Sequence, residues 1–277
     1  VLTHLEGLKS APQYAMPVDC ARWQGEAVVA VVAERREQAE DGAAMVAIEY
    51  LPLDPVTDME TAIDASTPVI HAELGDNLAW RREFSAGDTD AAFAASDTVV
   101  EETFEFGRHT GVTLEARAIL ADYDPSEEQL TVHLSGQAPH MMQGIYAEHF
   151  GLEDHKVRVI CKDVGGSFGI KVHTYADEMA TVGLSIMLRR PVKFVADRLE
   201  SFVTDIHARD HRVTARIGMT NDGRIQAMEI DDLTGVGPYS MYPRTSAIEA
   251  NQIVNMVGGP YAFENYKARA TVVYLNK

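Results

Sequence analysis

Apolar positions along this chain fall into short runs, some alternating with polar residues and some compact. Residues 99–106 alternate, which is typical of a strand with one buried face. Residues 26–32 form a compact apolar run of the kind found in buried strands. The same criteria predict further strands at residues 46–50, 118–123, 130–134, 157–160, 212–219, 224–231 and 268–274. These runs predict a chain rich in short strands.

Three helices are expected between the strands. Residues 34–45 combine alanines with charged residues, and residues 175–188 precede Pro191. Pro139 suits a first helical position and Gly151 suits a helix end, which together bracket a helix over residues 139–150.

Turn signals and chain ends refine this picture. Asn221, Asp222 and Gly223 lie between two predicted strands and are a strong hairpin signal. The last strand, 268–274, is followed by no closing element, so we expect an unpaired strand that seeks an edge to join. Since the chain also begins at Val1 without an initiator methionine, we expect the sequence to be part of something longer.

The elements group into two regions. Residues 1–60 form a small α/β unit, residues 61–97 are turn-rich and polar and are interpreted as a linker, and residues 98–277 form a second unit. The length and the 46% hydrophobic content allow two domains with proper cores. The fold class predicted from this order is α+β.

Charge and cysteine content narrow the function classes. Lysines and arginines number 24 against 42 aspartates and glutamates, a formal net charge of −18, which disfavours nucleic acid and anionic membrane surfaces as partners. No apolar run is long enough to span a bilayer. Cys20 and Cys161 are too few for a disulfide framework and form no CxxC pair. A cytoplasmic protein that borrows its electron carriers fits these observations best.

The most informative motif is the glycine run DVGGSFGIK at residues 163–171, between a predicted strand and a predicted helix. Such a loop aims backbone N–H groups at an anionic ligand. It is not a P-loop, because Ile170 separates Gly169 from Lys171, and with Ser167 after Gly166 it fits no dinucleotide fingerprint. The alternative is a tight turn whose glycines only supply positive φ.

Other motifs accompany this run in a fixed order. The glycine run resembles the GGGFGGK signature of molybdenum hydroxylases, and SGQAPH at residues 135–140 is similar to their Q-x-P segment. Further matches are GRH at 107–109, LE at 114–115, RPVKF at 190–194, DRLE at 197–200 and ARD at 208–210. WQGEAV at 23–28 with QAED at 38–41 and IEYLP at 48–52 resembles an α/β-hammerhead domain. The chain therefore resembles the molybdenum-binding subunit of the xanthine dehydrogenase, aldehyde oxidase and carbon monoxide dehydrogenase family.

The resemblance implies a hammerhead domain, in its C-terminal part, over residues 1–60 and an incomplete first molybdenum-binding domain over residues 98–277. It implies molybdenum held by molybdopterin or its cytosine dinucleotide form, with no direct protein ligand to the metal. Gln137, by its match to the family glutamine, would donate a hydrogen bond to an oxygen on the metal; the alternative is a glutamine that caps the following helix. The cofactor-contacting residues implied are Gln137, Gly165, Gly166, Ser167, Phe168 and Gly169.

Several side chains near this motif have open roles. Phe168 would cover the metal or serve as a core aromatic, and Lys171 would reach an anionic group or lie solvated on the loop. His109 and Glu115 are six positions apart in a strand-rich region, which does not place them together as an acid–base pair. We interpret both as structural polar residues.

Departures from the family pattern bear on the substrate. Ser167 and Ile170 replace two glycines, which points to the carbon monoxide dehydrogenase-like and N-heterocycle-oxidising branch. Val172 stands where purine-oxidising members carry a substrate-binding glutamate, so xanthine is a poor substrate candidate. The general-base glutamate of the family falls outside this stretch, so no catalytic residue is assigned here.

The function implied is part of a molybdopterin-dependent hydroxylase that oxidises an aldehyde, an N-heterocycle or a similar small molecule with water-derived oxygen. The expected partners are a second molybdenum-binding half, an iron–sulfur subunit and an FAD subunit, and the isolated chain is expected to be inactive. A competing hypothesis is a cofactor-free binding or assembly module of the same fold. The molybdenum and pterin content of the native complex would separate the two.

Overall fold

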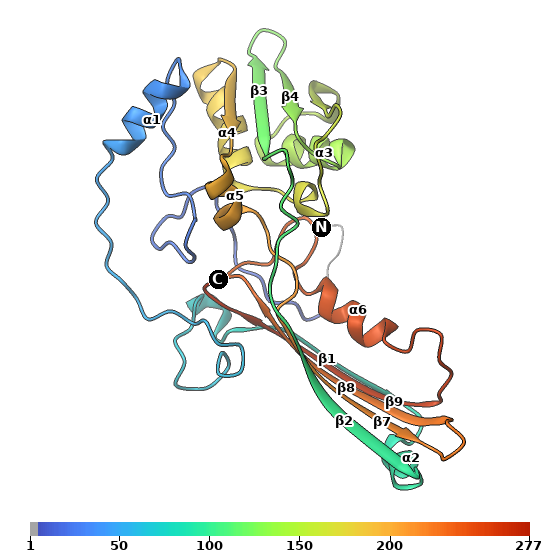
Figure 1. Cartoon of the computed structure of the whole chain (residues 1–277). Helices are drawn as coiled ribbons and strands as arrows, with labels where there is room; N and C mark the ends of the chain where they lie inside the picture. The colour runs from blue at the N-terminus through green and yellow to red at the C-terminus, as the bar shows by residue number, and fades with distance from the viewer. Residues whose placement is uncertain (1–4) are drawn as a thin grey trace. The chain divides into compact units, whose positions relative to one another are not determined.

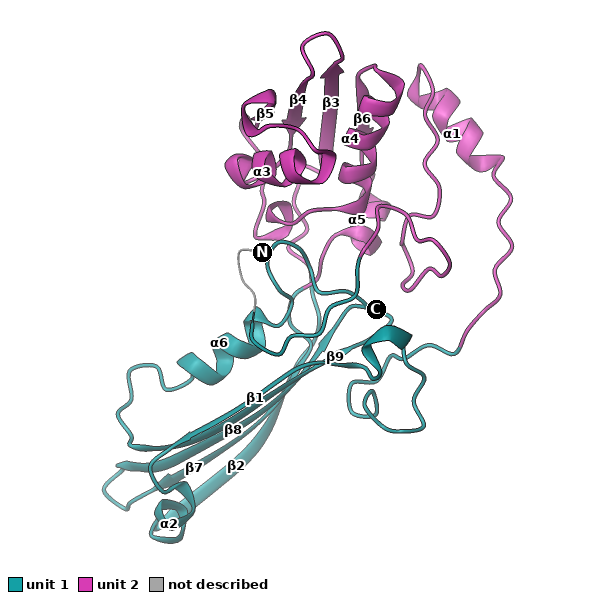
Figure 2. Cartoon of the chain, turned by 180° about the vertical axis from the view of Figure 1, so that it is seen from behind, with its two compact units in different colours: residues 1–12, 54–109, 208–277 teal, residues 13–53, 110–207 magenta. Residues whose placement is uncertain are grey.

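A computed structural model describes residues 5–277, which form two compact units (Figures 1 and 2). The first unit combines the chain up to Pro12 with Asp54–His109 and Ala208–Lys277. The second combines Gln13–Leu53 with Thr110–His207. Each unit carries one sheet and several helices, so the mixed α+β class predicted from the sequence is confirmed. Within residues 5–277, no helix is long and apolar enough to cross a membrane.

The first unit is built on a five-stranded sheet. Its strands lie in the order β1 (Leu78–Ala86), β9 (Asn265–Tyr274), β8 (Ile225–Val236), β7 (His211–Met219) and β2 (Thr98–Phe106). Neighbours are antiparallel except β8 and β9, which run parallel. The predicted hairpin joins β7 to β8, where Gly223 has a φ of 84° and its N–H donates to the Thr220 carbonyl at 2.9 Å.

The core of this unit lies between the sheet and one helix. Helix α6 (Ile248–Met256) packs on β8 and β9, as both overall views show (Figures 1 and 2). The buried residues Trp80, Ile230, Val254 and Val272 belong to this apolar cluster, whose burial is the main stabilising contribution of the unit. Shorter elements, α2 (Thr89–Ala94) and the 3-10 turn η1 (Ala72–Leu74), complete it.

The expectation of an unpaired last strand was wrong. Strand β9 lies inside the sheet, pairing with β1 on one side and with β8 on the other. Its buried alternate residues explain the position, because Ala268, Ala270 and Val272 face the core. A strand that buries a face in this way is stabilised by two neighbours, and the sequence near the chain end does not reveal that both come from earlier segments.

The second unit is built on a four-stranded sheet. Its strands lie in the order β5 (Val157–Ile160), β4 (Gln129–Leu134), β3 (Ala118–Asp124) and β6 (Val192–Val195). Only β4 and β5 are parallel. The alternate residues Ile119, Ala121, Leu130 and Val132 are buried, as the period of two in the sequence predicts. Three of these strands, β3, β4 and β5, were expected from the sequence, whereas β6 was not predicted.

Helices surround this sheet. Helix α3 (Pro139–Phe150) packs on β5, and α4 (Ala176–Leu188) packs on β3 and β6. Pro139 lies in the first turn of α3 and Gly151 ends it with a φ of 67°, as expected from these residue types. The remaining helices are α1 (Arg36–Ala44) and α5 (Arg198–Thr204), with the 3-10 turns η2 (Asp154–Lys156) and η3 (Ile170–Val172).

The strands expected at residues 26–32 and 46–50 are not formed. Both segments lack regular structure, and Val46, Ile48 and Tyr50 are exposed. An apolar run becomes a strand only when a neighbouring strand supplies hydrogen bonds and a face to cover it. No such neighbour lies beside these segments within residues 5–277. The helix expected between them is present as α1.

The segment interpreted as a linker contains regular structure. Residues 61–97 include β1 and α2, and Trp80 at the centre of this segment is 3% exposed. The turn-forming residues around β1 concealed its short apolar stretch. As domain boundaries, residues 1–60, 61–97 and 98–277 stay a prediction.

Candidate functional site

The glycine run forms an exposed loop between β5 and η3 in the second unit. Three of its residues have left-handed backbone: Gly166 with a φ of 100°, Phe168 with 48° and Gly169 with 86°. Two short hydrogen bonds shape it, from the Gly166 N–H to the Val164 carbonyl at 2.9 Å and from the Ile170 N–H to the Ser167 carbonyl at 2.8 Å. Glycine is needed at both of its positive-φ positions because a β-carbon is strained there.

The loop glycines are constrained by different surroundings. A β-carbon on Gly165 would lie 2.6 Å from the β-carbon of Glu115, so this glycine allows close contact with another segment. A β-carbon on Gly166 would lie 3.0 Å from the ring of Phe168. A β-carbon on Gly169 would meet nothing within 4 Å, so the space beside it is open. Of these three glycines, Gly169 is the one at which the described residues leave space for a side chain.

Glu115 binds the glycine loop at both of its ends. Its Oε2 accepts the Gly165 N–H at 2.9 Å, and its Oε1 accepts both the Ser135 hydroxyl and the Lys171 ammonium, the latter at 3.0 Å. The Ser135 hydrogen bond contributes most to lowering the pKa of Glu115 to about 2. Partial burial opposes this effect, and the Gly165 N–H and Lys171 reinforce it.

Lys171 therefore differs from both expectations for it. Its side chain is completely buried and forms an ion pair with Glu115. It is neither solvated nor directed at an external anion, because a buried ammonium requires a charged partner inside the protein. Glu115, interpreted as a structural polar residue, is that partner.

Gln137 lies immediately before α3, beside the glycine loop. Its backbone N–H donates to the Lys171 carbonyl at 3.1 Å, which ties the two segments together. Its side chain is exposed, and within residues 5–277 it makes no hydrogen bond that caps α3, whose N-cap residue is Ala138. The capping alternative is not realised in this structure, and the amide is left uncommitted.

Phe168 is 75% exposed, so the core-aromatic alternative for this residue is wrong. Its backbone is left-handed, with a φ of 48°, and its ring lies beside Gly166. A β-carbon at Gly111 would lie 3.0 Å from the Phe168 Cβ, which explains why glycine occupies position 111. A large apolar ring held in the open at a strained position is typical of a contact surface for a ligand or another chain.

A second charged cluster supports the other end of the loop. The buried Arg117 guanidinium binds Asp177 through two hydrogen bonds of 2.7 Å and Asp205 through one of 2.6 Å. The same guanidinium lies 3.7 Å from the centre of the Tyr175 ring. The Tyr175 hydroxyl donates to the Ile170 carbonyl at 2.9 Å. Arg117 thus positions Tyr175, and Tyr175 in turn binds the glycine loop at Ile170.

Glu178 completes this cluster at 3.3 Å from Arg117. Burial raises the pKa of Glu178 above its ordinary value, with Arg117 opposing and Asp177 reinforcing the increase. The sequence did not predict the cluster around Arg117. Asp177 and Asp205 lie 60 and 88 positions after Arg117, and the three residues share no motif.

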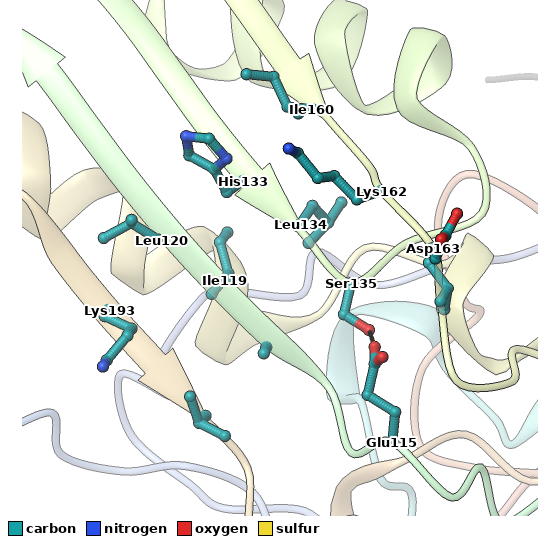
Figure 3. Close-up of a pocket in the computed structure, with 13 residues that line it drawn as sticks. Glu115, Ile119, Leu120, His133, Leu134, Ser135, Ile160, Lys162, Asp163 and Lys193 are labelled. Atoms are coloured by element: carbon teal, nitrogen blue, oxygen red, sulfur yellow. Dashed lines mark hydrogen bonds between the residues drawn. The ribbon is translucent and has the colours of Figure 1, made fainter.

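A pocket of about 330 Å³ opens on the four-stranded sheet of the second unit and is bordered by Ser135 and Glu115 (Figure 3). Figure 3 shows these two side chains pointing toward one another, with His133 and Lys162 further along the strands. The pocket is at the small end of ligand-binding cavities. Across residues 5–277, no group of three or more histidine, cysteine, aspartate or glutamate side chains is arranged to hold a metal ion.

The second unit is therefore an α+β unit with an exposed glycine loop, which is supported by two charged clusters and lies beside the exposed side chain of Gln137. The chain belongs to the molybdopterin cofactor-binding domain family, whose model matches residues 70–277. The recognition made from the ordered motifs is therefore confirmed.

Relatives and solved structures agree with this assignment. The chain is 35% identical over 244 residues to the nicotine 6-hydroxylase large subunit of Paenarthrobacter nicotinovorans, covering 88% of this chain and 30% of that protein. It is 31% identical over 268 residues to the carbon monoxide dehydrogenase large chain of Afipia carboxidovorans, covering 92% and 33%. The structure of quinoline 2-oxidoreductase from Pseudomonas putida 86 matches with a TM-score of 0.93 and 30% identity, covering 98% of this chain and 34% of that one. The chain thus spans about a third of the length of these proteins.

The loop residues fit the family's cofactor. Backbone N–H groups and an uncharged amide are suited to the phosphate and oxygen atoms of molybdopterin. The open space beside Gly169 and the exposed Phe168 leave room for a bulky group. Gly165 is the exception, because its lack of a side chain is explained by Glu115 alone.

Proposed function

We propose that this chain is the part of a molybdenum hydroxylase large subunit that cradles molybdopterin with its glycine loop. The observation that carries the proposal is the left-handed loop at Gly166 and Gly169 next to the uncommitted amide of Gln137. A structural turn needs neither an open side nor a free amide beside it. The match of the family model to residues 70–277 supports the same cofactor.

The roles proposed for individual residues follow from what each side chain leaves free. Gln137 donates a hydrogen bond from its uncharged amide to an oxygen of the cofactor, without adding charge. Gly166, Ser167 and Gly169 let the backbone approach the cofactor, and Gly165 maintains the loop's contact with Glu115. Phe168 covers the cofactor with its exposed ring.

When bound, the cofactor supplies the oxidation of a carbon centre with oxygen derived from water. The contribution of this chain is to bind, orient and shield it. We propose that the catalytic base and the remaining cofactor contacts lie in a second molybdenum-binding half. Iron–sulfur clusters and FAD on partner subunits would accept the electrons.

The proposed domain organisation places a hammerhead domain at residues 1–60 and the first molybdenum-binding domain at residues 98–277. The exposed apolar residues of segment 46–50 support the first assignment, because they need strands from elsewhere to cover them. Residues 61–97 join the two, and their strand β1 contributes to the sheet that contains β7, β8 and β9.

The proposed substrate is a small N-heterocycle or a similar molecule. The relatives are named for nicotine, nicotinate and carbon monoxide, and a matching structure for quinoline. Val172, at the position of the purine-binding glutamate, is 5% exposed and offers no polar group. A purine would therefore find no glutamate at this position.

The proposal is tested by measuring molybdenum and pterin in the natural protein, purified from its host with whatever subunits accompany it. We expect close to one molybdenum per chain and substrate-dependent dye reduction with an N-heterocycle. Absence of both metal and pterin would instead support a cofactor-free binding or assembly module.

The chain by itself should not turn over a substrate. Its last strand is paired, so an exposed edge at β9 no longer supports this expectation. The expectation of an inactive chain is supported by the family motifs present in it, none of which contains the general base. Sustained dye reduction by the isolated chain reconstituted with molybdopterin would show that it holds its own base.

A further inference from the structure

Three segments of the second unit meet at the carboxylate of Glu115. The first is the segment that carries Glu115 itself, just before β3. The second contributes the Ser135 hydroxyl at the end of β4, and the third is the glycine loop, which contributes Gly165 at its start and Lys171 at its end. The backbone N–H of Glu115 also donates to the Gly165 carbonyl at 3.1 Å. One residue therefore closes both ends of the loop.

The bonds made by Glu115 fix the orientation of its carboxylate. The Lys171 ammonium is completely buried, and Glu115 is the partner that the structure provides for its charge. Gly165 must lack a side chain because Glu115 lies against it. A carboxylate that accepts hydrogen bonds from a hydroxyl, an amide and an ammonium is held in one orientation, because charge-assisted bonds are the stronger ones.

The same residue reaches Gln137 through two short connections. Ser135 lies two positions before Gln137 in the chain, and the Gln137 N–H donates to the carbonyl of Lys171 at 3.1 Å. Both connections start from groups that Glu115 holds. The distance between the Gln137 amide and the glycine loop therefore depends on the Glu115 carboxylate.

We propose that Glu115 is the positioning residue that sets the glycine loop and Gln137 at the spacing the cofactor requires. It acts through Ser135, Gly165 and Lys171 and touches no cofactor atom itself. This role rests on the proposed function for its effect on the cofactor. Its effect on the loop is a property of this chain alone.

The test compares two variants of the natural protein. In Glu115→Gln the charge that balances Lys171 is lost, so both thermal stability and loop position are affected. In the double variant Glu115→Gln with Lys171→Met, no buried charge is left unpaired, so stability should largely return. Glu101→Gln, on an exposed strand with Arg216 at 3.9 Å, is the matched control.

Two readouts are measured on all variants: hydrogen exchange of peptides that cover residues 163–172, and molybdenum content. We expect loop exchange to rise about tenfold in both Glu115 variants, the effect of losing one or two hydrogen bonds. Molybdenum content should fall by on the order of tenfold in both, as for outer residues that orient a metal site. The control should match the wild type in both readouts.

Wild-type exchange and metal content in the double variant would overturn the proposal, because Glu115 would then be only a counter-charge for Lys171. A wild-type protein that contains no molybdenum would contradict the proposed function instead. Loop exchange would still decide the role of Glu115 in that case, because it needs no bound cofactor.

Discussion

Two glycine-containing turns of this protein have similar backbones and different support. Gly223, in the hairpin between β7 and β8, has a φ of 84°, and Gly169, in the glycine loop, has a φ of 86°. A β-carbon at either position would meet nothing within 4 Å. The hairpin is closed by bonds between Thr220 and its neighbours Gly223 and Arg224. The glycine loop is held by Glu115 and, through Tyr175, by Arg117.

The difference between the two turns lies in where their support comes from. A hairpin needs only the two strands that it joins, so its geometry is local. The glycine loop is held by Glu115, which lies 50 positions before Gly165 and 56 before Lys171, and the space beside Gly169 stays open. A ligand site needs a backbone held by its own hydrogen bonds and an accessible surface. Glu115 supplies the hydrogen bonds, and the position beside Gly169 is accessible.

The largest expected effect separates the two turns directly. Gly169→Val should abolish molybdenum retention, whereas Gly223→Val should leave the metal content unchanged. Both substitutions place a β-branched residue at positive φ and cost about 1–3 kcal/mol of stability, so the thermal stability of the two variants should fall alike.

Gly166→Val should also abolish molybdenum retention, because the new side chain would press on Phe168. Metal content is measured on the purified proteins. Normal metal in both loop variants would remove the loop from the cofactor site.

The next effect concerns the support of the loop. Arg117→Leu leaves Asp177 and Asp205 without their buried counter-charge, which should cost about 3–5 kcal/mol of unfolding free energy. Arg269→Leu removes an exposed partner of Asp231 and should cost at most about 1 kcal/mol. Urea unfolding of both variants checks this contrast. Equal losses would show that the cluster around Arg117 contributes no more than a surface pair.

A smaller effect is expected at Gln137. Gln137→Ala should lower turnover by on the order of 100-fold, the effect of removing one donor from a reacting centre, while the melting temperature changes little. Gln143→Ala, in the same helix region with its amide bound to the Asp154 carbonyl, is the control and should leave turnover unchanged. Equal losses of turnover and stability in Gln137→Ala, with the cofactor still bound, would identify a structural role.

The smallest effect is the acid dependence of stability. The pKa of Glu115 is lowered to about 2 in the folded protein from an ordinary value near 4.5. A lowered pKa means that the carboxylate stabilises the fold above the ordinary value and that this contribution is lost as the pH falls from about 4.5 to 2. Glu115→Gln should therefore show a shallower decrease of unfolding free energy over that range. Identical slopes in the two proteins would contradict the lowered pKa.

The sequence predicted the parts of this fold that local rules govern. Helix α3 begins at Pro139 and ends before Gly151, as the conformational preferences of those two residues require. The short helix α5 was not predicted, although Asp197 and Glu200 form a capping box at its start. The same rules failed for residues 26–32 and 46–50, because an apolar run does not state whether a neighbouring strand exists to pair with it.

Within the candidate site, the sequence by itself determined the loop. The glycines at positions 166 and 169 are required by positive φ, a property of the individual residue, and the ordered motifs around them identified the family. Only the tertiary structure decided that the ammonium of Lys171 pairs with Glu115 and that Arg117 gathers Asp177 and Asp205. The physical reason is that burying these charges requires partners from distant segments, and a linear pattern does not record which segments meet.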